Sequence, residues 1–249
     1  MTLWTLEVAR LTRTFRGLAL VAIYAFFGLL GPITARYMAE ILERFATDEL
    51  TVTVADPTPL DGLVQFIGNA SQLAVLAVVI VAAGALAIDA RAELAAFLRT
   101  RVAHPRDLVI PRYLLVTAAS AIALTVGTVI AVVLTTVLIG DLPLGATAVG
   151  TVYGILYLAF AIAVVAAVAG FVRSQLAAVF VSILVLLLLP VIGIVDAIAA
   201  WLPSSLLTAV LPIVAGEPAI DHLRAVAVTV IAIPLLVQLA IVRADRREL

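Results

Sequence analysis

The chain of 249 residues contains no cysteine and no lysine, and it has few charged residues of any kind. Without cysteine there is no disulfide, no thiolate metal ligand and no thiol nucleophile. Without lysine the chain cannot form a conventional phosphate-binding loop, because that loop needs a lysine on the β- and γ-phosphates of ATP. Charged residues make up 12% and hydrophobic residues 65%, against about 25% and about 45–50% in soluble domains. This composition predicts an integral membrane protein.

Ionisable residues are also missing from the middle of every long apolar run. A charge inside the bilayer costs at least about 2.5–3.5 kcal/mol and marks an ion or proton pathway where it occurs. Its absence argues against a proton- or sodium-coupled carrier, an intramembrane protease and a redox enzyme. The two histidines, His104 and His222, fall on opposite sides of the predicted membrane, so no metal site is expected. The net charge of −1 gives no reason to expect a nucleic-acid partner.

Six apolar runs are long enough to cross a bilayer, which takes roughly 20 residues. They predict an all-α membrane protein, one domain over residues 1–249, with transmembrane helices at residues 18–35, 63–88, 113–139, 147–172, 176–195 and 223–242. Twelve of the fifteen arginines lie in the two terminal segments and in the loops after the second and fourth spans. Because cytoplasmic loops carry the arginine excess, both termini are predicted to be cytoplasmic, with the protein multi-pass in the cell membrane.

Two segments outside the spans have patterns of their own. In residues 1–17 apolar residues recur every three or four positions, with Arg10 and Arg13 on the other face. This pattern predicts a helix lying in the membrane interface, and the alternative is a basic flank of the first span. Residues 196–222 are apolar but interrupted by three prolines. They predict two short helices dipping into the outer leaflet, with a surface-lying amphipathic loop as the alternative.

The loop between the second and third spans, residues 89–112, holds five of the arginines. Its first half is expected to continue the second span as a helix, which His104-Pro105 breaks. Pro105 is well placed to start a new short helix over residues 106–110, which Pro111 then ends or kinks. A loop that merely contacts lipid headgroups would explain the charge. It would not explain the helix–break–helix pattern, which predicts a short helix across the cytoplasmic surface.

This layout resembles the membrane subunit of a type-2 ABC exporter, an ABC transporter permease. The corresponding loop of that family typically reads Ser-Arg-Pro-Val-x-Arg-x-Glu-Leu-x-x-Gly-Lys after an apolar helix. Here Thr100-Arg101 resemble the Ser-Arg pair, Asp107-Leu108 the Glu-Leu pair and Arg112 the lysine. Val102 and Pro111 depart from the family's proline and glycine. The resemblance covers the layout of the whole chain, whereas the motif covers only this stretch of the loop.

The resemblance implies that two permeases pair, as two copies or with a paralogue, and that each docks a separate ATP-binding cassette subunit through the 89–112 loop. ATP and magnesium would be bound by that subunit, so neither a catalytic residue nor a cofactor is expected on this chain. The expected docking residues are Arg101, His104, Pro105, Arg106 and Asp107, with Arg10 and Arg13 of the interfacial helix.

In that family the second and fifth spans line the dimer interface, which makes Gln72 and Ser182 the expected pathway residues. Packing between helices is the alternative role for both. The alternative function for the whole chain is a membrane scaffold or anchor for another complex, with no transport.

Overall fold

The computed structural model describes residues 7–8, 13–45, 56–88 and 104–245, and this part of the chain contains helices and no β-strand. Six helical segments in it are long and apolar enough to cross a membrane. The fold class is therefore an all-α membrane bundle, as the sequence predicts.

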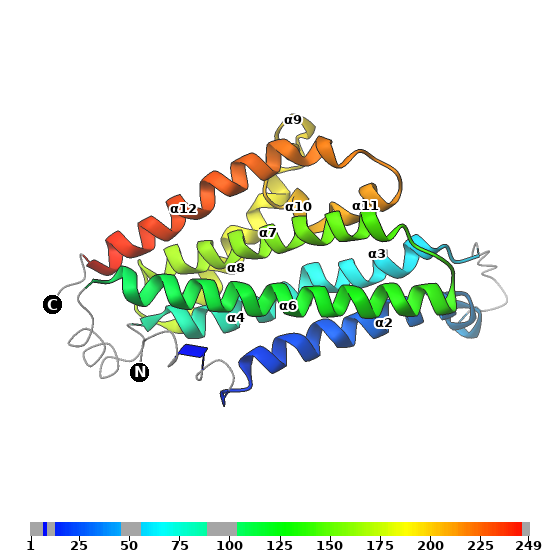
Figure 1. Cartoon of the computed structure of the whole chain (residues 1–249), viewed down its shortest axis with the longest axis horizontal. Coiled ribbons are helices and arrows are strands. Elements are labelled where there is room, and N and C mark those ends of the chain that lie inside the picture. Colours follow the sequence, from blue (N-terminus) through cyan, green and yellow to red (C-terminus); the bar gives the residue numbers. More distant parts are fainter. Residues whose placement is uncertain (1–6, 9–12, 46–55, 89–103, 246–249) are drawn as a thin grey trace.

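The six spans form an up-and-down bundle. They are α2 (Arg16–Phe45); α3 (Pro59–Asn69) continued by the π-helical turn η1 (Ala70–Ala74) and α4 (Val75–Leu86); α6 (Arg106–Leu138); α7 (Leu144–Ala169); α8 (Gln175–Ile192); and α12 (Leu223–Asp245). The start of α2, the end of α4, the start of α6 and the end of α12 lie at the same end of the bundle (Figure 1). We call this end, together with the turn between α7 and α8, the arginine-rich end.

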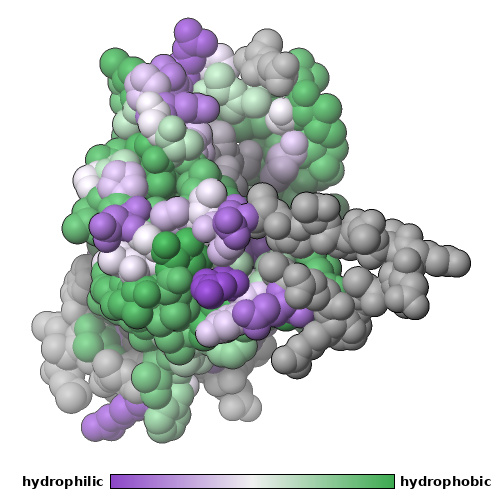
Figure 2. Space-filling view, turned by 90° about the vertical axis from the view of Figure 1, so that its right-hand side faces the viewer, coloured by the Kyte–Doolittle hydropathy of each residue, from purple (hydrophilic) through white to green (hydrophobic). Residues whose placement is uncertain are grey.

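Large apolar side chains cover the flanks of the bundle. Phe26, Ile122, Leu187 and Leu235 are 57%, 59%, 62% and 65% exposed. In a soluble protein such a surface would be an aggregation site, whereas a bilayer solvates it. Figure 2 looks onto the end opposite the arginine-rich end, where hydrophilic residues gather on the face turned to the viewer and hydrophobic residues lie around its sides.

Helix boundaries follow local signals at most positions. Pro59 begins α3, and the Asp61 carboxylate accepts a hydrogen bond of 2.7 Å from the Thr58 N–H, which satisfies one donor at the helix start. Helix α2 runs through Pro32 to Phe45, ten residues beyond the predicted end of the first span. The extra residues are mostly good helix formers such as alanine, glutamate and leucine, so nothing local stops the helix once it leaves the apolar run.

The start of the third span corrects the prediction of a separate short helix at residues 106–110. Helix α6 begins at Arg106 and continues through Pro111 without a break. Pro111 removes one backbone hydrogen bond near the helix start, but Leu108, Val109 and Tyr113 on either side of it are buried. Packing of this turn against the bundle thus outweighs the local helix-breaking tendency, and residues 106–110 form the first turn of the span.

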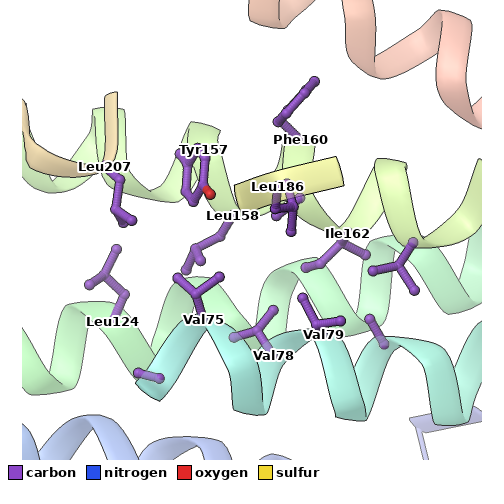
Figure 3. Close-up of a cluster of buried hydrophobic side chains, with 14 of the residues drawn as sticks. Val75, Val78, Val79, Leu124, Tyr157, Leu158, Phe160, Ile162, Leu186 and Leu207 are labelled. Atoms are coloured by element: carbon purple, nitrogen blue, oxygen red, sulfur yellow. The ribbon is translucent and has the colours of Figure 1, made fainter. Parts of the chain in front are cut away.

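Helix α7 lies at the centre of the bundle. In its most apolar stretch 67% of the residues are buried, against 17% in α8 and in α12. Val75, Val78 and Val79 of α4 point toward Leu158 and Ile162 of α7 in the main apolar cluster (Figure 3). Since lipid is as apolar as these side chains, close packing rather than escape from water holds such helices together.

Two glycines bring α2 and α6 into backbone contact. A Cβ atom added at Gly127 would lie 2.7 Å from the carbonyl oxygen of Tyr24, and one added at Gly28 would overlap the carbonyl of Gly127. Small residues at such crossings let the helix axes approach closely. This crossing holds the first and third spans together.

The segment between α8 and α12 contains α9 (Asp196–Ala199), α10 (Ser205–Thr208), α11 (Val210–Val214) and the 3-10 turn η3 (Ala219–His222). Helices α10 and α11 lie between α12 and α7 (Figure 1). Leu206 and Val210 are 0% and 2% exposed, and α11 packs on Gly150 of α7, where a Cβ atom would meet the Val210 side chain at 2.5 Å. The segment therefore consists of short helices, and two of them, α10 and α11, pack on α7.

Candidate functional site at the arginine-rich end

The predicted docking residues that the structure describes are exposed at the start of α6. The side chains of Arg106 and Asp107 are 61% and 48% exposed, and Arg106 Nε lies 3.9 Å from Asp107 Oδ1. An exposed ion pair of this length contributes little to stability, so both side chains remain available to a partner. His104 is exposed just before them, and Pro105 is the N-cap residue of α6.

The opposite face of the same turn is fixed to the bundle. Leu108 and Val109 are 7% and 5% exposed. Charged side chains on one face are therefore presented by a turn whose other face is anchored. Arg13 is exposed just before α2; the two remaining predicted docking residues, Arg10 and Arg101, lie outside the described residues.

A buried ion pair joins Glu7, which precedes α2 in the chain, to Arg112 of α6 at this end. The side chain of Arg112 is 2% exposed, and its Nε and Nη2 atoms lie 2.8 Å and 2.7 Å from Oε1 of Glu7, whose side chain is 13% exposed. Arg112 Nη1 also donates to the carbonyl oxygen of Ala85, at 3.4 Å, in the last turn of α4. Removing one partner of a buried pair typically costs about 3–5 kcal/mol, because the other charge is left in a low-dielectric site.

Sequence reasoning assigned neither Glu7 nor Arg112 to a contact. Glu7 belongs to the polar face of the predicted interfacial helix, and Arg112 matches the lysine of the family's loop. One signal in the sequence could have found the pair: Glu7 is the only acidic residue before Glu40, and it stands among several arginines. A lone carboxylate in a basic segment is a good candidate for a specific partner. Its partner cannot be chosen from the sequence because the two residues are 105 positions apart.

Arg16 of α2 and Gln175 of α8 meet over Gly84 of α4. A Cβ atom at Gly84 would lie 2.9 Å from Arg16 Nη1 and 3.2 Å from Gln175 Nε2. The missing side chain of Gly84 thus provides the space in which the guanidinium and the amide lie. A small recess next to this contact is lined by Glu7, Arg16 and Arg112 together with apolar side chains of α4 and α6, so these three charged side chains lie around one recess.

The end of α12 is fixed to the same end of the bundle. The guanidinium carbon of Arg243 lies 4.3 Å from the ring centroid of Phe171, in the turn between α7 and α8. Cation–π contacts of this kind are worth about 0.5–1 kcal/mol at exposed sites. A Cβ atom added at Gly170, in the same turn, would lie 3.0 Å from the Cβ atom of Arg243.

The two predicted pathway residues do not share a surface within one chain. Gln72 lies in the middle of the second span, on an exposed face with Leu73 and Leu76 at 53% and 37% exposure. Ser182 is 0% exposed inside the bundle, and its Oγ atom has no hydrogen-bond partner in the described part of the chain. Only Gln72 is therefore accessible from outside a single copy.

The other polar residues near Gln72 bond within their own helix. Asn69 Nδ2 donates to the carbonyl of Gln65, and Ser71 Oγ donates to that of Gly68, both at 2.9 Å. These bonds lie at the start of the π-helical turn η1, in which the backbone hydrogen-bond pattern departs from that of an α-helix. They satisfy local backbone groups and leave the amide of Gln72 on the exposed face.

Within residues 7–8, 13–45, 56–88 and 104–245, no group of three or more histidine, aspartate and glutamate side chains is placed to hold a metal ion. Comparisons with protein-family models, with curated proteins and with solved structures found no match to the chain.

Proposed function

We propose that the chain is the membrane-spanning subunit of an ATP-driven ABC transporter, an exporter, and that a separate ATP-binding subunit docks at its arginine-rich end. The observation that carries the proposal is the start of α6. Exposed Arg106 and Asp107, preceded by exposed His104, stand on the same unbroken helix of 33 residues that crosses the bundle. A subunit that binds these side chains would therefore be attached to one end of a rigid transmembrane helix.

The length of α6 supports this use. A helix of 33 residues is about 50 Å long at 1.5 Å per residue, whereas the hydrocarbon core of a bilayer is about 30 Å thick. About 20 Å of helix therefore extends beyond the hydrocarbon, and the charged first turn lies in this excess. ATP-driven closure of two partner subunits would then displace the third span directly. Because the chain has no lysine, the phosphate-binding loop must belong to that partner.

Pairing with a second permease is supported by the exposed amide of Gln72. An amide in the middle of a span is poorly solvated by lipid tails, so a protein partner is the favourable environment for it. An amide carries both donors and an acceptor, and it can pair with its own copy across a two-fold axis. We therefore assign the exposed face of the second span to the contact between two permeases.

Replacing Arg106 and Asp107 together by alanine is expected to abolish docking. Loss of buried charged contacts at the centre of an interface typically weakens binding by about 2 kcal/mol or more, which is on the order of thirtyfold in Kd. The measurement is co-purification of the ATP-binding chain with the tagged permease in mild detergent, with bound chains identified by mass spectrometry.

The matched control variant replaces one arginine and one acidic residue at the end of the bundle opposite the arginine-rich end. Arg36 and Glu40 are both exposed on α2, and their replacement by alanine is expected to leave co-purification unchanged. Undiminished recovery of the ATP-binding chain with the Arg106/Asp107 variant would refute the docking assignment. Recovery of no nucleotide-binding chain by the unmodified protein, with the bundle still folded, would favour the membrane scaffold instead.

A cysteine at position 72 is expected to cross-link two copies. The chain has no cysteine of its own, so Gln72→Cys gives a single reactive site. Oxidation in membranes should produce a covalent dimer on a denaturing gel. Ile122→Cys, on α6 and 59% exposed, is the control and should stay monomeric. A monomer for both variants, or equal dimer for both, would contradict the pairing through the second span.

A further inference from the structure

The N-terminal segment does not continue α2. Phe15 has a φ of 55°, in the left-handed region that non-glycine residues rarely adopt, and it is 70% exposed. The chain therefore changes direction immediately before Arg16, where α2 begins. The position of Glu7 is consequently not set by a continuation of α2.

The contact with α6 holds Glu7 in place. Arg112 lies six residues after Arg106 on the same helix, about 9 Å along its axis. Two of its nitrogen atoms bind one oxygen of Glu7, at 2.8 Å and 2.7 Å, and a third reaches the Ala85 carbonyl of α4. One buried guanidinium thus connects three segments of the chain.

We infer that the pair Glu7–Arg112 is a joint that makes residues 7–8, the end of α4 and the start of α6 move as one unit. Its role in transport rests on the proposed function, whereas the joint itself does not. Neither charge is stable in a buried site without its partner. The ion pair therefore stays formed while a docked subunit displaces α6, and Glu7 moves with the third span. Arg112 is in this sense a positioning residue.

A spin label on the N-terminal segment tests the joint without any partner protein. Val8 is 44% exposed, and Val8→Cys provides a single labelling site in a chain without cysteine. Arg112→Gln and Glu7→Gln should each increase label mobility severalfold. The exposed Arg106→Gln is the matched control on the same helix and should leave mobility unchanged.

The Glu7→Gln variant and a charge swap keep the test decisive. Glu7→Gln leaves α6 intact, so it decides the question even where Arg112→Gln fails to fold. The charge swap Glu7→Arg with Arg112→Glu should restore part of the lost immobilisation, because an opposite pair is again present. Label mobility that is the same in the unmodified protein, Arg112→Gln and Glu7→Gln would overturn the joint.

The functional part of the test uses the assembled transporter. Arg112→Gln should retain the ATP-binding subunit but lower ATP-dependent transport about tenfold, the size of a typical coupling between sites. Loss of that subunit from Arg112→Gln would show that Arg112 acts in docking, and would overturn its positioning role. A mobility change in the two variants, together with no ATP-binding chain that co-purifies with the unmodified protein, would leave the joint standing and refute the transporter function, so the two failures are distinguishable.

Discussion

Replacing Arg112 by alanine is expected to destabilise the folded bundle by about 3–5 kcal/mol, because it removes the guanidinium that binds the Glu7 carboxylate, whose side chain is 13% exposed. Glu7→Ala should have an effect of similar size for the converse reason. The measurement is the midpoint of thermal unfolding in mild detergent, combined with unfolding by added denaturing detergent.

The double variant Glu7→Ala with Arg112→Ala separates pairing from packing. If the pair acts as one unit, the double variant should be much less destabilised than the sum of the two single variants, since no isolated charge remains. Arg106→Ala is the control, because its side chain is 61% exposed, and surface substitutions usually change stability by less than about 0.5 kcal/mol. Strictly additive effects of Glu7→Ala and Arg112→Ala would mean that the two side chains do not depend on each other.

Alanine at Gly127 is expected to destabilise the bundle, although alanine favours helix by about 1 kcal/mol over glycine. The new Cβ atom would lie 2.7 Å from the carbonyl oxygen of Tyr24 and 3.0 Å from its carbonyl carbon. These are backbone atoms that cannot rotate away, so α2 and α6 must move apart. Overpacking of this kind typically costs about 1–3 kcal/mol.

The control for Gly127 is Gly145, which lies in the first turn of α7, where an added Cβ atom would meet no other atom within 4 Å. Gly145→Ala should be neutral or stabilising by up to about 1 kcal/mol, so the two identical substitutions differ in their effect. The same unfolding midpoint measures both. A stabilised Gly127→Ala variant would show that the crossing of α2 and α6 is looser than the close approach of their backbones indicates.

The predictions for Arg112 and Gly127 concern two different contacts of the third span. Gly127 controls how closely the first and third spans approach inside the bundle, whereas Arg112 connects the third span to the segment before the first. In the proposed transporter, a displacement of α6 would therefore move α2 and Glu7 with it. Variants at Gly127 should accordingly affect transport even where the docking residues are intact.

The sequence alone determined the number of spans, their approximate positions and the end at which arginines concentrate. These features depend on the transfer of each segment from water to lipid, which is a sum over neighbouring residues and needs no tertiary contact. The absence of lysine, of cysteine and of charges inside the spans can likewise be read from the sequence without any tertiary contact.

Helix ends were predicted less well, and the errors have a common cause. The break expected at Pro111 does not occur, because Leu108 and Val109 are buried against the bundle and hold the first turn of α6 in line with the rest. A local signal was outweighed there by packing that a linear pattern does not contain. The docking residues predicted at Arg106 and Asp107 are exposed, but they stand on the span itself and not on a separate helix.

Contacts between distant residues were decided only by the tertiary structure. Which face of a helix points inward depends on its rotation against its neighbours, and in an apolar span every face is equally hydrophobic. The sequence therefore could not tell that Ser182 is enclosed while Gln72 is open, nor that Gly28 meets Gly127. It contained Glu7 and Arg112 as two unrelated charges. Two membrane-spanning segments separate these residues along the chain. Only the packing of those segments in the bundle brings Arg112 Nη2 to 2.7 Å from Glu7 Oε1.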